Sequence, residues 1–502
     1  HGLVKKQNRK LEWKLRTVEM LWSCLPIKDY PAEELELLWK KLLINQFHDI
    51  IPGSSINLVY QTTHKEYEKI HNGCDKLILR AGQSLFQEIP DAFVLANTLS
   101  YVWKGTIFIP ESMRGYAILD ENGQPLPLQE TIEGTVAAVD LAPLSFETFK
   151  KGNPIQSSME KGDNLTLEND FILYEFDQQG QLISGYDKET SKEVLGGAGN
   201  ILSLYEDRPN DYDAWDVEFF YRDAIIENAK ISNDIHKAIG NAVKQLVFSF
   251  RIGNSTIKQL VSLHNHSKRV DFSTTVDWNE KHKMLRVHFP VNVRSDQATF
   301  DIQYGYVKRN THRNTSWDKA KFEVVGHKYA DLSDHDYGVS LLNDCKYGYM
   351  VHDNILDLNL LRSPSNPDPD ADEGLHEFTY SLFPHIKDFI HSDVIAESSC
   401  LNQPPILFKD SATKAEMPVR LEGIGLELSV MKKAENEDDW TLRIIETHGQ
   451  HSSGFLYLRG SLIESDLMEW GKIGEKIQVE ESIQLDLKPF EIRTFRYNTI
   501  VV

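Results

Sequence analysis

His48 and Asp49 are two adjacent titratable residues at the end of an apolar stretch of the sequence. An imidazole is a common metal ligand, and a neighbouring carboxylate can accept hydrogen bonds from a bound molecule. Pro52 and Gly53 interrupt the chain directly after the pair. Because polar groups in apolar surroundings need partners, the pair predicts one corner of an active site. The alternative is that His48 only satisfies carbonyls at a helix end, with Asp49 in the following turn.

Trp215 and Asp216 form a second candidate pair, after a loop sequence at residues 208–211. An indole ring can cover the C–H face of a sugar while carboxylates accept hydrogen bonds from its hydroxyls. Functional residues are common on loops, which favours this interpretation, and Asp213 is a weaker candidate. The alternative is a core tryptophan at a strand end, flanked by solvated acids.

A stretch rich in proline and aspartate at residues 363–373 follows Arg362. Alternating aspartates can bind calcium, but the spacing of a helix–loop–helix calcium site is absent and prolines interrupt the stretch. We expect a solvated loop that pairs partly with Arg362. The pairs at 277–278 and 317–318 join tryptophan and aspartate too, and we interpret them as packing and turn residues.

Three helices must position His48 and Asp49. Apolar residues recur at spacings of three and four over residues 3–23 and again after Pro31, where a second helix should reach about His48. Ser54 or Ser55 offers an N-cap for a third helix that Pro90 closes. Its predicted core seam is Tyr60, Thr63, Tyr67, Ile70, Cys74, Leu77 and Ala81. Residues 1–90 are therefore predicted to form a three-helix bundle.

After Pro90 the apolar period changes from 3.6 to 2, and no helix longer than two turns is expected from there to residue 502. The predicted fold class is α+β and multidomain, with the three-helix bundle followed by a large all-β region of antiparallel sandwiches. We expect a small β unit at 91–158, a large sandwich at 159–400 and a C-terminal β unit at 401–502.

The composition narrows the class of protein. The 502-residue chain has a net charge of −21 and no long basic stretch, which argues against nucleic acid and membrane surfaces as partners. No apolar run approaches the length of a membrane span. Four widely spaced cysteines favour a reducing compartment, and we expect a cytoplasmic protein. Since the chain starts at His1 without methionine, we expect it to be part of a longer protein, so a targeting signal upstream stays open.

The segment Asn-Gln-Phe-His-Asp-Ile-Ile-Pro-Gly-Ser-Ser at 45–55 closely resembles the helical-domain motif of the α-mannosidases of glycoside hydrolase family 38, in their bacterial and yeast-type branch. Residues 5–12 resemble the Lys-x-x-Asn-Arg-x-x-Glu of the preceding helix in that family. Further similar stretches lie at 167–169, 206–209, 213–216, 277–278, 289–290, 314–318 and 488–492. The resemblance covers essentially the whole chain.

The resemblance implies that His48 supplies one zinc ligand and that Asp49 contacts the bound sugar, with Trp215 and Asp216 at the rim of the mannose pocket. It also implies a galactose-mutarotase-like supersandwich for the large β region and a structural interface role for the stretch at 363–373, near the catalytic domain. In the family an N-terminal (β/α) domain supplies the remaining ligands and the nucleophile, and no such sequence is present in these residues. We therefore expect no catalytic residue here, no mannoside hydrolysis by the chain alone and no tight zinc binding.

The expected function is that of a C-terminal portion of a retaining, divalent-metal-dependent α-mannosidase. Its partners would be mannose-containing oligosaccharides and the N-terminal catalytic domain, and a homo-oligomer stays open. One alternative is a carbohydrate-binding or structural β module without chemistry of its own. Another is a mannosyl-glycerate hydrolase of the same family. Linkage preference and metal identity do not follow from the sequence.

Overall fold

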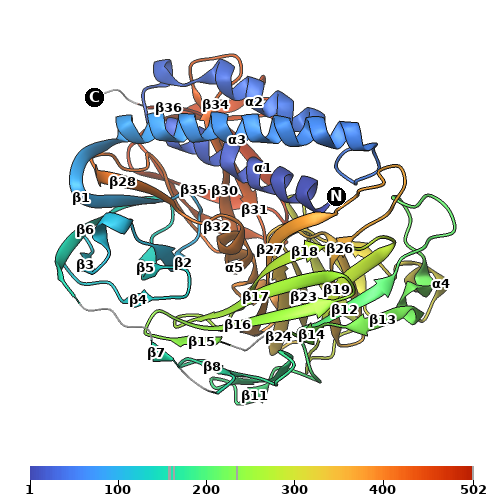
Figure 1. Cartoon of the computed structure of the whole chain (residues 1–502). Coiled ribbons are helices and arrows are strands. Elements are labelled where there is room, and N and C mark those ends of the chain that lie inside the picture. The colour runs from blue at the N-terminus through green and yellow to red at the C-terminus, as the bar shows by residue number, and fades with distance from the viewer. Residues whose placement is uncertain (156–159, 162–163, 233–235, 500–502) are drawn as a thin grey trace.

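The computed structural model describes residues 1–155, 160–161, 164–232 and 236–499, so the expected boundary at 158/159 lies outside it. Three helices form an N-terminal bundle, namely α1 (Gly2–Trp22), α2 (Ala32–Asn45) and α3 (Asn57–Leu85). An extensive antiparallel β region follows. Figure 1 shows the bundle lying across one side of the β region. The predicted fold class is confirmed.

The helices pack through apolar stripes at helical spacing. Val4, Leu11, Leu15 and Val18 of α1 are fully buried and meet the stripes of both other helices in one core. All seven residues of the seam predicted for α3 are buried. Burial of each large apolar side chain contributes about 1.5–3 kcal/mol, so these stripes account for the bundle without help from helix propensity.

Three predicted helix boundaries are wrong. Helix α2 ends at Asn45, which leaves His48 in the following turn. Helix α3 starts after Ile56, whose side chain forms no capping hydrogen bond, so the predicted serine cap is absent. Pro90 does not close α3, since it lies inside β1 (Phe86–Asn97). The strand tolerates this proline because its pairing with β28 (Ile406–Thr413) is interrupted between Glu88 and Phe93.

Two small sheets follow the bundle. One has the order β28-β1-β6-β3, with β6 at Ser145–Pro154 and β3 at Tyr116–Leu119. The other has the order β2-β5-β4, with strands at Trp103–Phe108, Thr135–Leu141 and Leu128–Glu130. Strand β28 comes from the stretch expected to form the last unit, yet it pairs with β1. The C-terminal part of the chain therefore completes a sheet begun directly after the helices.

The large β region contains three sheets. Its 11-stranded sheet comprises β21 (Gly305–Asn310), β20 (Gln297–Ile302), β23 (Tyr329–Ser333), β24 (Tyr337–Asn343), β27 (Gly374–Ile386), β18 (Val270–Trp278), β17 (Ser255–His264), β16 (Val243–Ile252), β15 (His236–Ile239), β7 (Glu160–Lys161) and β14 (Lys230–Ile231). The six-stranded sheet comprises β13 (Ile225–Asn228), β12 (Ile201–Glu206), β19 (Lys283–Pro290), β26 (Ile355–Arg362), β25 (Gly348–His352) and β22 (Val324–Val325). The four-stranded sheet comprises β11 (Lys192–Glu193), β10 (Leu182–Asp187), β9 (Ile172–Phe176) and β8 (Thr166–Glu168).

Side chains from all three sheets meet in the largest apolar core of the described residues, where Phe272, Phe289 and Tyr380 pack ring against ring. Trp278 is fully buried there, as its packing interpretation predicted. Two short helices interrupt the strands, α4 (Ser316–Ala320) and α5 (Val394–Asn402). With nine residues α5 is slightly longer than the two turns expected.

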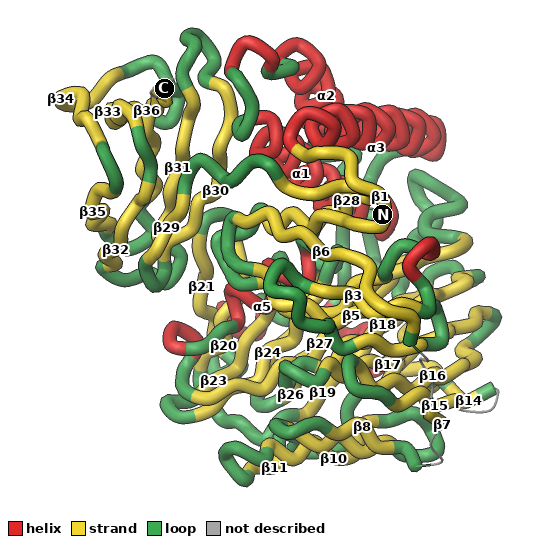
Figure 2. Tube along the Cα trace, turned by 90° about the vertical axis from the view of Figure 1, so that its left-hand side faces the viewer, coloured by secondary structure: helices red, strands yellow, loops and turns green. Residues whose placement is uncertain are grey.

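The last sheets form a separate C-terminal layer (Figure 2). One comprises β29 (Arg420–Glu422), β32 (Ser452–Tyr457) and β35 (Ser482–Leu487), and the other comprises β30 (Leu426–Lys433), β31 (Trp440–Glu446), β36 (Ile492–Thr499), β33 (Gly460–Ser465) and β34 (Lys472–Val479). Helix α1 packs beside β30 and also contacts β26 and β27 of the large region. No helix in the described residues has the length and apolarity needed to cross a membrane.

Helix α1 carries charged residues into these contacts. Arg9, Arg16 and Glu19 are all buried, although they belong to a helix whose other buried residues are mostly apolar. The Glu19 carboxylate accepts a hydrogen bond of 2.9 Å from the Trp39 indole of α2. Burial raises the pKa of Glu19 to about 7, although the Trp39 hydrogen bond and the Lys432 charge act in the opposite direction.

We predict that Glu19→Gln changes the pH dependence of stability. The folded state holds the Glu19 proton more tightly than the unfolded state, so its contribution is present below pH 4.5 and is lost as the pH rises to about 7. At pH 8 the variant should exceed the original chain in unfolding free energy by up to about 3 kcal/mol, with little gain at pH 4.5. Denaturant unfolding across this range measures the difference, and parallel curves for the two proteins would contradict the prediction.

Candidate functional site

His48 and Asp49 lie in the turn at residues 46–56 that joins α2 to α3. The His48 Nε2 atom lies 3.5 Å from Asp49 Oδ2, and the two side chains are 79% and 38% exposed. The imidazole of His48 is thus largely open to solvent, and the Asp49 carboxylate is partly so. The ring of His48 also packs on the ring of Phe47, with centroids 4.2 Å apart.

Hydrogen bonds within the turn at residues 46–56, and one from α3, hold its backbone in place. The Phe47 carbonyl accepts hydrogen bonds from the N–H groups of Ile50 and Ile51, at 2.8 and 3.1 Å. Gly53 has a φ of +97°, which a residue with a side chain adopts only at a cost. Tyr60 of α3 donates its hydroxyl to the Asp49 carbonyl, 3.3 Å away. These contacts fix the direction in which the His48–Asp49 pair projects.

One face of α1 holds the same turn from outside. The Lys5 ammonium donates to the carbonyls of residues 51–52, each 3.1 Å away. The Gln46 amide donates to Asn8 Oδ1 at 3.0 Å and to Glu12 Oε1 at 2.7 Å. Burial lowers the pKa of Lys5 to about 8, with Asp372 acting in the opposite direction. Lys5, Asn8 and Glu12 are thus the residues that position the turn.

The second candidate pair lies on the loop after β12. Trp215 is 56% exposed and Asp216 is exposed as well, so the alternative of a core tryptophan is wrong. The amides of both residues donate to the carbonyl of Tyr212, at 2.8 and 2.9 Å. Tyr212 is itself exposed and has a φ of +55°. The loop therefore presents two aromatic rings and a carboxylate to solvent.

Arg362 holds this loop in place from the end of β26. Its guanidinium donates to the buried Asp207 carboxylate at 2.6 and 3.4 Å and to the Asp213 carbonyl at 2.9 Å. It also donates to the carbonyls of Ala214 and Asp216. The predicted pairing of Arg362 with the acidic stretch after it is therefore wrong. A buried carboxylate 155 residues away is the partner, which the local sequence does not reveal.

The acidic stretch at 363–373 joins the two candidate pairs. Asp213 accepts backbone hydrogen bonds of 2.7 and 3.0 Å from residues 365–366, next to the Trp215 loop. Asp368 accepts from Asn57 of α3 at 3.0 Å, and Asp372 accepts from the Gly2 amide of α1 at 2.8 Å. The side chains of both aspartates are buried, whereas those of Asp370 and Glu373 are 62% and 44% exposed, so the expectation of a solvated loop holds for part of the stretch only. The interface role agrees with the buried contacts.

The turn at 46–56, the loop at 207–216 and the stretch at 363–373 thus lie at one end of the molecule, on the right of Figure 1. The two candidate pairs are linked through the third segment, and no direct hydrogen bond between them occurs among the described residues. His48 can offer one imidazole ligand to a metal, but a zinc site needs three or four ligands. The described part of the chain contains no group of three histidine, cysteine or acidic residues arranged for a metal ion. By themselves these residues do not complete a zinc site.

Known proteins match along nearly the whole chain. The profile of the alpha mannosidase middle domain matches residues 1–85. The glycosyl hydrolases family 38 C-terminal domain matches 167–370, and the C-terminal beta sandwich domain of that family matches 425–495. The chain belongs to glycoside hydrolase family 38. This confirms the resemblance that the 45–55 segment indicated.

Alpha-mannosidase 2C1 of Homo sapiens is 32% identical over 98% of the chain and 48% of its own length. Alpha-mannosidase G of Dictyostelium discoideum is 31% identical over 98% of the chain and 51% of its length. The chain thus spans about half the length of these relatives. The crystal structure of an alpha-mannosidase from Enterococcus faecalis shares the fold, with a TM-score of 0.79, 18% identity and coverage of 99% of this chain and 67% of that one.

The sequence contains a physical signal for the positioning residues besides the family resemblance of residues 5–12. Lys5, Asn8 and Glu12 are spaced three and four apart, which places them on one face of a helix. Charged and amide side chains on one face, beside an otherwise apolar stripe, indicate a polar contact with a neighbouring element. No comparable signal connects Arg362 to Asp207, because their contact depends on the strand order of the six-stranded sheet.

We predict that Lys5→Met loosens the turn that carries His48 and Asp49. The substitution removes two charge-assisted hydrogen bonds and should lower the free energy of unfolding by about 2 kcal/mol. Hydrogen–deuterium exchange should show faster exchange at the amides of Ile50, Ile51 and Gly53 than elsewhere in the bundle. Lys10→Met, at an exposed position of the same helix, is the matched control and should leave these amides unchanged.

Proposed function

We propose that this chain is the middle and C-terminal portion of a retaining, divalent-metal-dependent α-mannosidase that acts on mannose-containing oligosaccharides. The observation that carries the proposal is the exposed His48–Asp49 pair, fixed at the end of the bundle within the segment that matches the alpha mannosidase middle domain. The names of the relatives, which are alpha-mannosidases, support the substrate class. We further propose a cytoplasmic protein, in keeping with its four free cysteines.

In this proposal His48 supplies one ligand to a zinc ion, which would bind sugar hydroxyls when present. Asp49 accepts hydrogen bonds from the mannose hydroxyls, because its carboxylate is exposed beside His48. Trp215 covers an apolar face of the sugar at the rim of the pocket, with Asp216 as a further acceptor. Retaining hydrolysis needs two carboxyl groups about 5–5.5 Å apart on either side of the scissile bond. We assign neither of them to this chain and expect both in an N-terminal catalytic domain.

The surface around His48 supports such a partner domain. Ile44, Phe47, Ile56 and Leu58 are each more than half exposed and surround the turn. Apolar side chains that gather on one surface of a folded protein commonly mark an interface. An N-terminal catalytic domain packed on this surface would cover these side chains and bring its own metal ligands to His48. The same arrangement explains why we expect the chain alone to be inactive.

Zinc binding by the chain alone tests the incomplete metal site. One imidazole and one adjacent carboxylate should bind zinc only weakly, so calorimetric titration should show no stoichiometric binding at micromolar concentrations. Any weak signal should decrease further in His48→Ala. Tight binding of one zinc ion per chain, lost in His48→Ala, would mean that the chain completes a metal site and would contradict this part of the proposal.

Reconstitution tests the activity. The chain should be mixed with the separately produced N-terminal region of its own full-length protein, and hydrolysis of p-nitrophenyl α-mannoside measured with added zinc. We expect activity from the mixture, no activity from the chain alone, and a loss of at least about a hundredfold for His48→Ala. Lys10→Met serves as the control with unchanged activity.

The other functions predict different outcomes of the same experiment. A carbohydrate-binding or structural module would give no hydrolysis in the mixture under any condition. A mannosyl-glycerate hydrolase would hydrolyse mannosyl-glycerate in preference to α-mannobiosides. A panel of both substrate types, with α-1,2, α-1,3 and α-1,6 mannobiose, therefore distinguishes the candidate functions and measures the linkage preference.

A further inference from the structure

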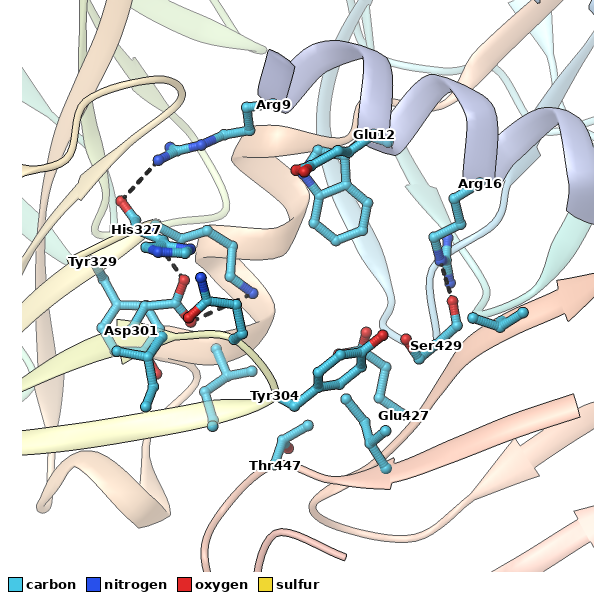
Figure 3. Close-up of a pocket in the computed structure, with 18 of the residues that line it drawn as sticks. Arg9, Glu12, Arg16, Asp301, Tyr304, His327, Tyr329, Glu427, Ser429 and Thr447 are labelled. Carbon is cyan, nitrogen blue, oxygen red and sulfur yellow. Dashed lines mark hydrogen bonds and ion pairs between the residues drawn. The ribbon is translucent and has the colours of Figure 1, made fainter. Parts of the chain in front are cut away.

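A cavity of about 410 Å³ lies where α1 and α2 meet the large β region and the C-terminal layer (Figure 3). The volume is within the range of about 300–1,000 Å³ in which proteins bind small molecules. Six acidic and aromatic side chains of its wall come from four elements. They are Glu12, Trp13 and Glu19 of α1, Trp39 of α2, Tyr304 of the β20–β21 hairpin and Glu427 of β30.

Aromatic side chains form part of the cavity wall. Trp13 and Trp39 are half-buried, and Tyr304 projects into the same space from the opposite side. Tyr304 occupies the hairpin turn with a φ of +53°, a conformation that costs free energy for a residue with a side chain. The hairpin thus holds an aromatic ring against the cavity at a cost to its own backbone.

Three carboxylates border the cavity without a cationic partner. Glu12 accepts a hydrogen bond from Gln46 at 2.7 Å, Glu19 from Trp39 at 2.9 Å and Glu427 from Tyr101 at 2.9 Å. None of the three forms an ion pair with a described residue. Each carboxylate has two oxygens that can accept several hydrogen bonds, so further acceptor capacity remains toward the cavity.

The cations in the wall are engaged by the framework. Arg9 donates to five neutral oxygen atoms of the large β region, and Arg16 donates to four neutral oxygen atoms around the C-terminal layer. Lys328 lies 3.8 Å from Asp301. Cations and carboxylates of the wall therefore nearly balance in number. The cavity favours neither a cation nor an anion, but it offers acceptors and aromatic faces to a neutral ligand.

We propose that this cavity binds a neutral polyhydroxylated ligand, namely a pyranose sugar of one or two residues. Hydroxyl groups of the sugar donate to Glu12, Glu19 and Glu427, while its C–H faces pack on the aromatic walls. A neutral ligand leaves the net charge of the cavity unchanged, and its hydroxyls use the free acceptor capacity of the three carboxylates. The proposal does not depend on mannosidase activity, since it concerns binding by residues that all lie in this chain.

The raised proton affinity of two of these acids agrees with a neutral ligand. Burial raises the pKa of Glu19 to about 7 and also raises the pKa of Glu12. A protonated carboxyl can donate to a sugar hydroxyl, and an ionised one can accept from it. A cationic ligand would instead favour fully ionised acids throughout the wall.

Calorimetry with the chain itself tests the proposal, using methyl α-D-mannopyranoside, maltose and, as a cationic probe, putrescine. We expect saturable binding of at least one sugar, with a change in tryptophan fluorescence, and no binding of putrescine. Tyr304→Gly removes the ring while suiting the positive φ, so the fold should persist. It should weaken sugar binding about threefold to tenfold, and Glu427→Gln should weaken it similarly.

Ser191→Gly is the matched control, because Ser191 has a φ of +55° at an exposed turn outside the cavity. It should leave sugar binding unchanged. Absence of sugar binding up to about 50 mM would overturn the proposal, as would binding of putrescine alone. Sugar binding that Tyr304→Gly leaves intact and Trp215→Ala abolishes would also overturn it, because the sugar would then bind the loop at 207–216. These outcomes are independent of whether the reconstituted enzyme hydrolyses mannosides.

Discussion

The structure depends on two buried guanidinium groups of α1. Removing such a group from water costs several kcal/mol unless its N–H donors find acceptors. Arg9 uses the oxygens of Asn343, His327, Lys346 and Tyr347, and Arg16 uses those of Ser429, Leu428, Thr98 and Gln403. Most of these acceptors are backbone carbonyls of loops and strands. A shift of α1 by one turn would leave both charges without partners. The two arginines therefore fix how the helix lies against the large β region and the C-terminal layer.

Because the two arginines fix the position of α1, they also fix the segments that bind to its other faces. One face holds the turn of His48 and Asp49 through Lys5, Asn8 and Glu12. Glu12 also borders the central cavity, so a single carboxylate connects the candidate active-site turn with the cavity wall. The first turn of α1 is joined to the stretch at 363–373, which in turn holds the Trp215 loop. The site is therefore assembled on one helix and not on a single sheet.

The periodicity of apolar residues predicted which helices and strands form better than it predicted where they begin and end. The bundle, its seam and the all-β region follow from the spacing of apolar residues, which reports burial directly. Helix ends depend on hydrogen-bond partners that spacing does not reveal, and this is why α2 stops before His48 and Pro90 lies in a strand. The interrupted pairing around Pro90 needs β28, more than 300 residues later in the sequence. No local rule could have predicted that partner.

The residues of the candidate site also differ in how far the sequence could predict them. His48 and Asp49 are adjacent in sequence, so their residue types alone indicated a joint role. Trp215 reaches the same end of the molecule only because Arg362 binds Asp207 and because residues 365–366 donate to Asp213. Each contact spans about 150 residues and joins the loop after β12 to the end of β26 or to the stretch directly after it. The charged residues that build these links are buried and paired, whereas the candidate substrate contacts are exposed. Exposure of a charged or aromatic side chain beside a buried ionic framework is thus the feature that separates the proposed binding residues from the residues that position them.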